Sequence, residues 1–550
     1  MVKAADIPVP QAPQLTTSDD RVAAVLTRAR EISDLGAIRA LAEWDMNTAL
    51  PEGAGAVRGE QMATLQGVIH EKWTEQRFGE LIASLSESVV RSSYTDADRA
   101  LLRVVNRARA QAMKLPRGLV EEMARVESGA FEAWRNARDT NDFALFAPWL
   151  ARTISLQREV ADRYGYKVTR YDALLDLYEP GLTTARVDSL FTTVRDVTLR
   201  LLGRIKASGA DVDVTPLEGS FPADRQMALT RRVLTGMGYD FRRGDIAVSP
   251  HPFTTDFGSP YDVRLTVHPD ERLIDSCILA AIHEGGHALY EQGSAPALAR
   301  TLLAGGVSMG AHESQSRLWE NIIGRSEAYW QGQFGALRET FPEKYADMRP
   351  ETFARALNRV TPSLIRIEAD EVTYNLHIII RFEMEKAIVN GEISIESLPS
   401  MWNQKYKDYL GIEPPTDSEG ILQDIHWTSG FGYFPTYTLG NLYAAQIAAA
   451  LREAHPDMDA RLAAGDTTFA LAWLRERMYQ WGKVYEPETL IRIVTGEAPD
   501  PRFFTEYLTR KFEAIYDLPA DPGSATKQAR HTAPNISATG GSKTSDRAKK

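Results

Sequence analysis

The chain of 550 residues is long enough to bury a large hydrophobic core, and its 43% hydrophobic and 25% charged residues are typical of globular proteins. Its formal net charge of −11 gives no attraction to nucleic acid or to an anionic membrane surface, so neither partner is expected. Cys277 is the only cysteine, which excludes internal disulfides and fits a reducing compartment. Because we find no apolar segment of signal-peptide or transmembrane length, we expect a cytoplasmic protein.

The two ends of the chain have the composition of disordered segments. Residues 1–19 are rich in Pro, Thr and Asp. From Asp521 onward, six Lys or Arg oppose two Asp, and Ile536 is the single large apolar residue. We therefore predict a disordered tail over 1–19, one folded domain over 20–518 and a disordered basic tail over 519–550.

Between the tails the chain has mainly the periodicity of α-helices, with apolar residues at intervals of three and four. The segments with this pattern are 20–32, 58–71, 96–165, 182–206, 224–236, 351–390 and 440–518. A cap at 18–20 is expected to begin the first helix. The segment 364–370 is predicted to open a long helix that reaches toward Lys386. The fold class that follows is mainly α.

One short region has a different period. In residues 261–267 the apolar Val263, Leu265 and Val267 alternate with polar residues, and a period of two predicts a β-strand. We expect a small antiparallel sheet here. Arg264 falls on the polar face of the strand, where the pattern alone favours an exposed arginine or one paired with Asp262.

The segment 275–293 contains the pattern HExxH on a predicted helix. Positions four apart share one face of a helix about 6 Å apart, so His283 and His287 can hold one metal ion together. Glu284 lies about 100° around the axis, where a carboxylate can take a proton from a metal-bound water. The same pattern can be a solvated helix face, so a third ligand is needed to decide.

Two glutamates are candidates for that third ligand. Glu291 lies on the same face but about 9 Å along the axis from the histidines, too far for a bond of roughly 2 Å, and is expected at the surface or behind the ligands. Glu313, in the cluster His312-Glu313-Ser314-Gln315 that opens another helical stretch, is the predicted ligand. The alternative for Glu313 is an ordinary first-turn glutamate favoured by the helix dipole.

A segment rich in glycine and aromatic residues, 420–440, contains His426, Tyr433 and Tyr437. Loops held by a rigid scaffold often carry function, so we interpret this segment as a binding loop. The alternative is an aromatic loop that fills part of the core.

The motifs together resemble the carboxypeptidase Taq family of metallocarboxypeptidases. Those that carry the resemblance lie, in chain order, at 251–253, 262–266, 283–287, 312–315, 365–370 and 420–427. The resemblance covers about 20–518. It implies a helical fold with a deep groove between two halves, a small sheet beside the metal, and a cytoplasmic homodimer that releases single residues from peptide C-termini with broad specificity.

The resemblance also implies the contents of the metal site. It supports Glu313 as the third ligand beside His283 and His287, a set that accepts Zn²⁺ and also Co²⁺. Glu284 would then be the base that activates water. His426, Tyr433 and Tyr437 are the candidate donors to the developing oxyanion; each such donor is typically worth about 3 kcal/mol.

An exopeptidase of this kind must recognise the terminal carboxylate of a peptide. A guanidinium fork matches a carboxylate bidentately, which makes Arg366 and Arg264 the candidates, with His251 lining the same pocket. Asp370 and Asp424 could orient metal ligands or could be structural carboxylates.

Two other functions remain open. A helical zinc oligopeptidase or dipeptidase would share the metal site but would not need an arginine for the terminal carboxylate. A non-enzymatic peptide-binding protein would not need a base at Glu284, and the presence of that residue argues against it.

Overall fold

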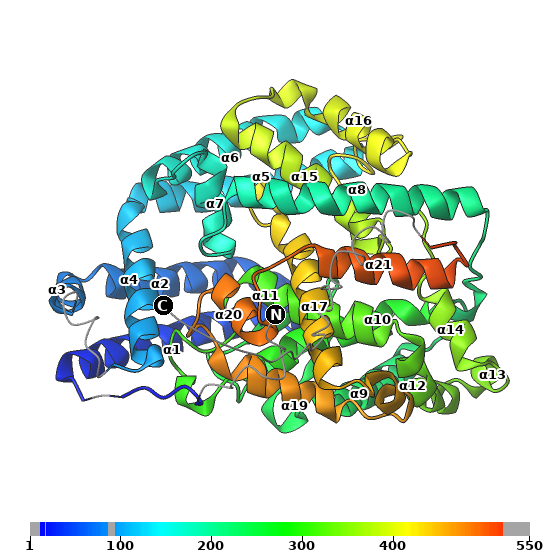
Figure 1. The fold of residues 1–550 in the computed structure, drawn as a ribbon. Helices are drawn as coiled ribbons and strands as arrows, with labels where there is room; N and C mark the ends of the chain where they lie inside the picture. The colour runs from blue at the N-terminus through cyan, green and yellow to red at the C-terminus, as the bar shows by residue number, and fades with distance from the viewer. Residues whose placement is uncertain (1–10, 17, 86–93, 521–550) are drawn as a thin grey trace, which may run out of the picture.

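The structure is a computed structural model, and it describes residues 11–16, 18–85 and 94–520. The mainly α fold is confirmed (Figure 1). The predicted tails lie mostly outside the described residues, so the domain boundaries stay a prediction. Within the N-terminal one, the backbone N–H of Thr16 donates to Asp98 over 2.9 Å. None of the described helices is long and apolar enough to cross a membrane.

The first four helices pack around a hydrophobic cluster that is separate from the main core. Asp19 caps the first of them by accepting from the backbone N–H of Arg21 over 2.9 Å, which confirms the predicted helix start. A second cluster of buried apolar residues joins these helices to the segment 295–304 and to Val484. The helices are α1 (Asp20–Thr48), α2 (Gly55–Thr74), α3 (Gln76–Ser84) and α4 (Asp96–Lys114).

Six further helices gather in the upper part of the view in Figure 1. They are α5 (Arg117–Thr140), α6 (Phe143–Tyr164), α7 (Arg170–Tyr178), α8 (Thr184–Ser208), α15 (Tyr374–Asn390) and α16 (Leu398–Leu410). The buried helix α15 lies among α6, α7, α8 and α16, so residues far apart in sequence build one core.

The lower part holds the two helices that carry the HExxH and His-Glu motifs. They are α10 (Ile274–Gln292) and α11 (Met309–Arg317), the latter continued by a π-helix over Leu318–Gly324. Helix α9 (Ala223–Met237) packs against α10 and against α12 (Glu327–Thr340), which in turn contacts α13 (Pro342–Tyr345), α14 (Pro350–Ala356) and α18 (Met458–Ala463). Helix α19 (Thr468–Arg477) also lies in the lower part. Helix α17 (Pro435–Ala454) packs along α11 and also reaches α15 above.

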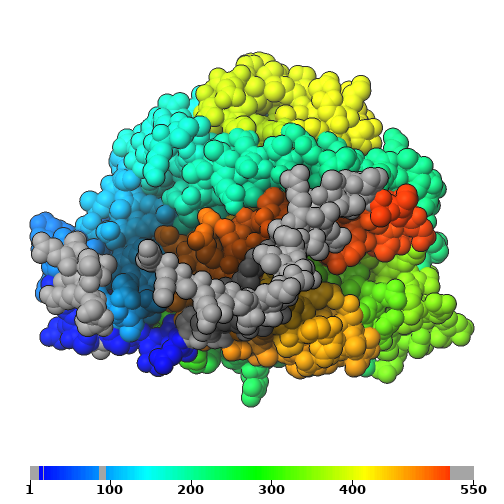
Figure 2. Space-filling view, viewed as in Figure 1, coloured from blue at the N-terminus to red at the C-terminus, as the bar shows by residue number. Residues whose placement is uncertain are grey.

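The two halves also meet through the last helices of the chain. On the face drawn in Figure 2, α20 (Pro487–Thr495) and α21 (Arg502–Ile515) lie between the upper and lower masses. The deep groove implied by the family resemblance stays a prediction.

The small sheet exists, but it is mixed and not antiparallel as predicted. Its strands are β1 (Ile246–Val248), β2 (Thr254–Asp256) and β3 (Val263–Val267), in the order β1-β3-β2. The chain reverses between β1 and β2 and again between β2 and β3. Two reversals restore the original direction, so β3 is antiparallel to β2 and parallel to β1.

The long helix predicted to begin near 364 begins ten residues later, at Tyr374. Before it, Arg366–Glu368 form a single 3₁₀ turn. The reason is Asp370, whose carboxylate accepts from the backbone N–H groups of Val372 and Thr373 over 2.9 and 3.0 Å. Aspartate that bonds to the backbone ahead of it favours a turn or a cap over a helix interior.

Helix α10 can approach α11 closely because glycine occupies the point of contact. A Cβ added at Gly286 would lie 2.6 Å from the carbonyl oxygen of Gln315 and 2.7 Å from Cα of Ser316, which are backbone atoms. At the neighbouring Gly285 the nearest atom is Cδ2 of Leu234, the movable end of a side chain.

We predict that Gly286→Ala lowers the free energy of unfolding by about 1–3 kcal/mol relative to Gly285→Ala, as overpacking of a core does. Both variants gain the same helix propensity, so the difference isolates the collision with α11. Urea denaturation of the two variants measures it. Equal stability of the two proteins would contradict the prediction.

Candidate metal centre

Two imidazoles and one carboxylate converge between α10 and α11. Ligand atoms of His283, His287 and Glu313 all lie within 4.8 Å of one another. Oε2 of Glu313 is 3.7 Å from Nε2 of His283 and 3.5 Å from Nε2 of His287. The three residues predicted as ligands are therefore brought together, and their donor atoms are those that Zn²⁺ accepts.

Each histidine has a partner at its other ring nitrogen. Nδ1 of His283 lies 2.9 Å from a carboxylate oxygen of Glu320, and Nδ1 of His287 lies 2.6 Å from Nδ1 of His312. Burial lowers the pKa of His287 to about 4, so its ring is neutral at pH 7, as a metal ligand must be. Both Nε2 atoms consequently face the shared carboxylate oxygen of Glu313.

The buried carboxylate of Glu313 is held by a guanidinium. Nε of Arg317 donates to Oε1 of Glu313 over 2.7 Å, while Ser316 donates to Oε2 over 3.0 Å. Burial alone would raise the pKa of Glu313, but Arg317 and His283 outweigh it and hold that pKa well below its ordinary range. The carboxylate is therefore ionised, with Oε2 turned toward the histidines.

Arg317 also ties Glu313 to Glu320. Its Nη1 lies 3.2 Å from the same oxygen of Glu320 that contacts His283. Glu320 stands on the π-helix, and Arg325 donates to its other oxygen over 3.0 Å. Neither Arg317 nor Glu320 was picked out from the sequence; the available signal was their spacing of four and seven from Glu313, which places all three on one helix face.

Glu284 is buried on α10, the helix of the two histidines, beside the sheet. The hydroxyl of Thr254, on β2, donates to Oε2 of Glu284 over 2.6 Å. Burial raises the pKa of Glu284. Thr254 was also missed from the sequence, since its strand is only three residues long.

Tyr374, the first residue of α15, lies between Arg317 and the predicted loop residues. The Arg317 guanidinium lies over the ring of Tyr374 at 4.3 Å, and Tyr374 packs edge-on against Tyr437 at 6.4 Å. Nε2 of His426 is 3.3 Å from the hydroxyl of Tyr437, and the ring of Tyr433 lies 5.2 Å from that of Tyr437. These loop residues therefore stand together beside the candidate ligands. Burial, and after it the negative charge of Glu313, raises the pKa of Tyr433.

Arg366 is buried under this aromatic group. Its Nε and Nη2 both donate to Oδ1 of Asp424, over 3.1 and 2.8 Å, and its guanidinium lies over Tyr437 at 5.1 Å. The other oxygen of Asp424 accepts from Arg381, which is fully buried. Two guanidiniums share one carboxylate, so the cluster keeps an excess of positive charge.

Two other predicted residues stand apart. Arg264 forms a bidentate pair with Asp262, over 2.8 and 2.7 Å, and lies over Phe257 at 4.9 Å. His251 is exposed, and its backbone carbonyl accepts from Ser249. The contacts of the described residues thus favour Arg366 over Arg264 as the arginine beside the candidate ligands.

The contacts of Asp370 and Asp424 among the described residues favour the second of the two interpretations given above, that of structural carboxylates. Asp370 binds the backbone ahead of α15, and Asp424 binds the two arginines. Glu291 lies behind the candidate ligands and not at the surface, since it is buried and its Oε1 lies 2.6 Å from Nε2 of His312.

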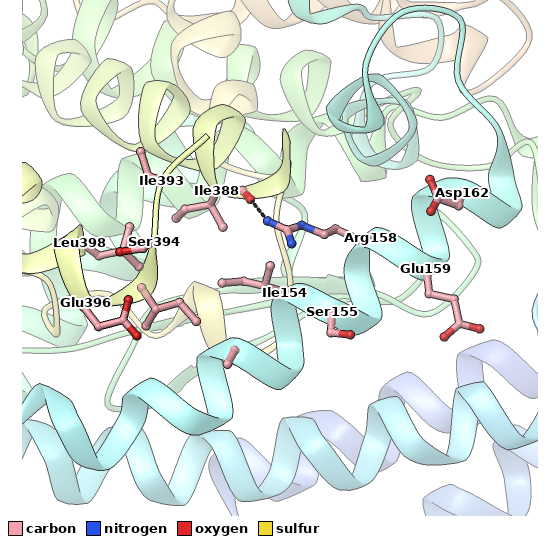
Figure 3. A pocket seen from close by; sticks show the side chains of 12 residues that line it. Ile154, Ser155, Arg158, Glu159, Asp162, Ile388, Ile393, Ser394, Glu396 and Leu398 are labelled. Atoms are coloured by element: carbon pink, nitrogen blue, oxygen red, sulfur yellow. Dashed lines mark hydrogen bonds between the residues drawn. The ribbon is translucent and has the colours of Figure 1, made fainter. Parts of the chain in front are cut away.

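A cavity of about 510 Å³ lies elsewhere, between α6 and the segment 388–398 (Figure 3). Arg158 reaches across it and donates to the backbone carbonyl of Ile388 over 2.6 Å, at the end of α15. None of its lining residues is among the candidate site residues.

A helical fold that brings two histidines one turn apart to a glutamate of a second helix, with a buried carboxylate next to them, defines a class of metallopeptidases. Known proteins identify the family. The model of the carboxypeptidase Taq (M32) metallopeptidases matches residues 24–512. Carboxypeptidase 1 of Bacillus subtilis is 40% identical over 490 residues, which is 89% of this chain and 97% of that protein.

Solved structures agree. The M32 carboxypeptidase of Deinococcus radiodurans has a TM-score of 0.87 at 37% identity, covering 91% of this chain and 100% of that one. Metallocarboxypeptidase 1 of Trypanosoma cruzi has a TM-score of 0.84 at 35% identity, covering 90% and 99%. The chain belongs to the carboxypeptidase Taq family and is a metal-dependent carboxypeptidase, which confirms the resemblance seen in its motifs.

One buried carboxylate links the upper half to the helix of Glu313. Glu179 follows α7 and accepts from the backbone N–H of Gly310, in the first turn of α11, over 3.0 Å. It also accepts from the hydroxyl of Tyr443 over 3.2 Å. Burial raises the pKa of Glu179 from its ordinary 4.5 to about 7.

This raised pKa predicts how stability changes with pH. Between about pH 4.5 and 7 the folded protein holds a proton that the unfolded chain has lost, so stability falls as pH rises through this range. Gln at 179 cannot ionise, yet it can accept from Gly310 and donate to Tyr443. Glu179→Gln should remove a loss on the order of 3 kcal/mol between pH 5 and 8.

Urea denaturation of wild type and variant at both pH values measures this difference. Other titrating groups are common to the two proteins and cancel in the comparison. An identical loss of stability in both would contradict the prediction.

Proposed function

We propose that the protein releases single residues from the C-termini of peptides with broad specificity, using Zn²⁺, or alternatively Co²⁺, held by His283, His287 and Glu313. The observation that carries this proposal is the convergence of these three side chains, with Glu284 buried beside them. Cytoplasmic location and a homodimer are further proposals, which rest on the family resemblance.

The residues fit a divalent cation. Two imidazole nitrogens and one ionised carboxylate oxygen face a common point, and each imidazole has a partner behind it. A cation bound there would polarise the scissile carbonyl and lower the pKa of a water toward about 7.

Glu284 is the proposed general base. It accepts the proton that the attacking water loses, and it passes this proton to the amine that leaves when the peptide bond breaks. Thr254 supports this role because its hydroxyl holds one oxygen of Glu284 and leaves the other for the water. The raised pKa of Glu284 makes it a better base than an exposed glutamate.

His426, Tyr433 and Tyr437 are proposed to donate to the oxyanion that develops on the substrate carbonyl. Burial lowers the pKa of His426 to about 4 and raises the pKa of Tyr433, so at pH 7 the imidazole is neutral and the phenol keeps its proton. Such donors act only if they are already oriented, and the contacts among the three rings orient them.

Arg366 is proposed to bind the terminal carboxylate of the peptide. Asp424 occupies its Nε and Nη2, which leaves the Nη1 edge outside that pair. Because Asp424 is shared with Arg381, the site retains positive charge for an incoming anion. Arg264 and His251 are proposed to act farther out in the same pocket, a role that rests on the family resemblance.

We predict that Glu284→Gln slows release of C-terminal residues by about 10²–10⁴-fold, as expected when a general base is lost. A mass-spectrometric time course on an unblocked peptide measures it, with wild type and chelator-treated protein alongside. The variant should keep wild-type zinc content. Full activity of the variant would refute the assignment of the base, whereas internal cuts by wild type would favour an oligopeptidase.

We predict that Arg366→Gln lowers kcat/KM for a peptide with a free C-terminus by about 10–100-fold, the loss expected for hydrogen bonds to a charged group. Cleavage of the same peptide with an amidated C-terminus, slow in wild type, should change little. Arg264→Gln is the matched control, with a smaller effect because Arg264 pairs with Asp262 and lies over Phe257, apart from the rings beside Glu313. Equal losses on free and amidated peptides would exclude Arg366 as the carboxylate anchor.

A further inference from the structure

Two histidine rings face each other through their Nδ1 atoms next to the candidate metal centre. Nδ1 of His287 and Nδ1 of His312 are 2.6 Å apart, and the rings are tilted by 44° with centroids 4.7 Å apart. A hydrogen bond between two ring nitrogens needs one donor and one acceptor, so one of the two Nδ1 atoms carries a proton and the other does not.

The far side of His312 is held by a carboxylate. Nε2 of His312 lies 2.6 Å from Oε1 of Glu291, and the backbone N–H of Gly306 donates to the same oxygen over 3.0 Å. An ionised carboxylate accepts only, so Nε2 of His312 carries a proton. A ligand that binds metal through Nε2 carries its proton at Nδ1, so in the proposed ligand set His287 donates to Nδ1 of His312.

We propose that His312 and Glu291 are positioning residues that fix the tautomer and the orientation of His287. With the proton of His287 at Nδ1, its Nε2 has a free lone pair on the side of Glu313, which is what a metal ligand requires. His283 is oriented by a carboxylate directly, through Glu320, whereas His287 is oriented through an intervening imidazole. This inference rests on the proposed ligand set.

The surrounding backbone holds the pair in place. A Cβ at Gly306 would lie 2.5 Å from Cδ2 of His312, and one at Gly305 would lie 2.6 Å from Oε2 of Glu291. Gly305 has a φ of +81°, which side chains rarely allow. The loop 305–306 therefore closes directly on both side chains, so neither has room to turn away from His287.

The test is the rate at which zinc-loaded protein releases its metal to an excess of chelator, followed by the absorbance of a zinc indicator. His312→Leu removes both hydrogen bonds and should speed release by about 10–100-fold. In His312→Asn the side-chain oxygen can still accept from His287, so this variant should recover most of the loss. The melting temperature of the metal-free proteins shows whether a variant is merely destabilised.

Release from His312→Leu at the wild-type rate would overturn the inference while leaving the proposed ligands intact. So would equally fast release from the Leu and Asn variants. If His312→Leu does not fold, Glu291→Met replaces it, since it removes the acceptor behind His312 and should also speed release. Wild type that takes up no zinc would overturn the proposed function and this inference together.

Discussion

The centre depends on keeping a carboxylate ionised inside the protein. A buried charge without a partner is costly, and Glu313 is buried at the contact of α11 with α10 and α17. Arg317, one turn further along the same helix, supplies the opposite charge at 2.7 Å. Because Arg317 binds Oε1 of Glu313, Oε2 is the oxygen that remains for the histidines.

The same guanidinium extends this order to a second residue. Arg317 contacts Glu320, Glu320 contacts His283, and Arg325 completes the charge balance. Packing supports the electrostatics: a Cβ at Gly440 of α17 would lie 2.4 Å from Cγ of Glu313, so that helix presses directly on the carboxylate side chain. The ion pair with Arg317 and the close approach of α17 thus both limit the conformations open to the Glu313 side chain.

Local patterns of the sequence were enough to predict the helical class, a strand within 261–267, and the shared helix face of His283 and His287, because each depends on a period of two or of about four residues. Glu313 was chosen from its place in a polar cluster that opens a second helical stretch, and the family resemblance supported that choice, since no local rule says which distant glutamate will meet a given helix. The predicted antiparallel direction of β1 and the predicted start of α15 near 364 were wrong. Both depend on turns, where chain reversals and the side chain of Asp370 outweigh periodicity.

The partners behind the ligands were beyond local reasoning for a different reason. His312 and Glu291 are 21 residues apart and meet only after α10 and α11 have packed. Thr254 reaches Glu284 from a three-residue strand with no periodic signal. Side chains of this kind are defined by tertiary contacts, and their types are common on any protein surface.

The π-helix after α11 makes this part of the chain intolerant of changes in length. Such a turn holds one residue more than an α-helical turn, so deleting a residue within 318–324 would restore the regular helix without breaking it. Residues inside the segment, Glu320 among them, would turn relative to Glu313, because a π-turn advances each residue by less than the roughly 100° of an α-helix. Glu320 would leave His283, which means that a deletion here preserves secondary structure but removes the support of a ligand, whereas most substitutions on the outer face of the same segment would not.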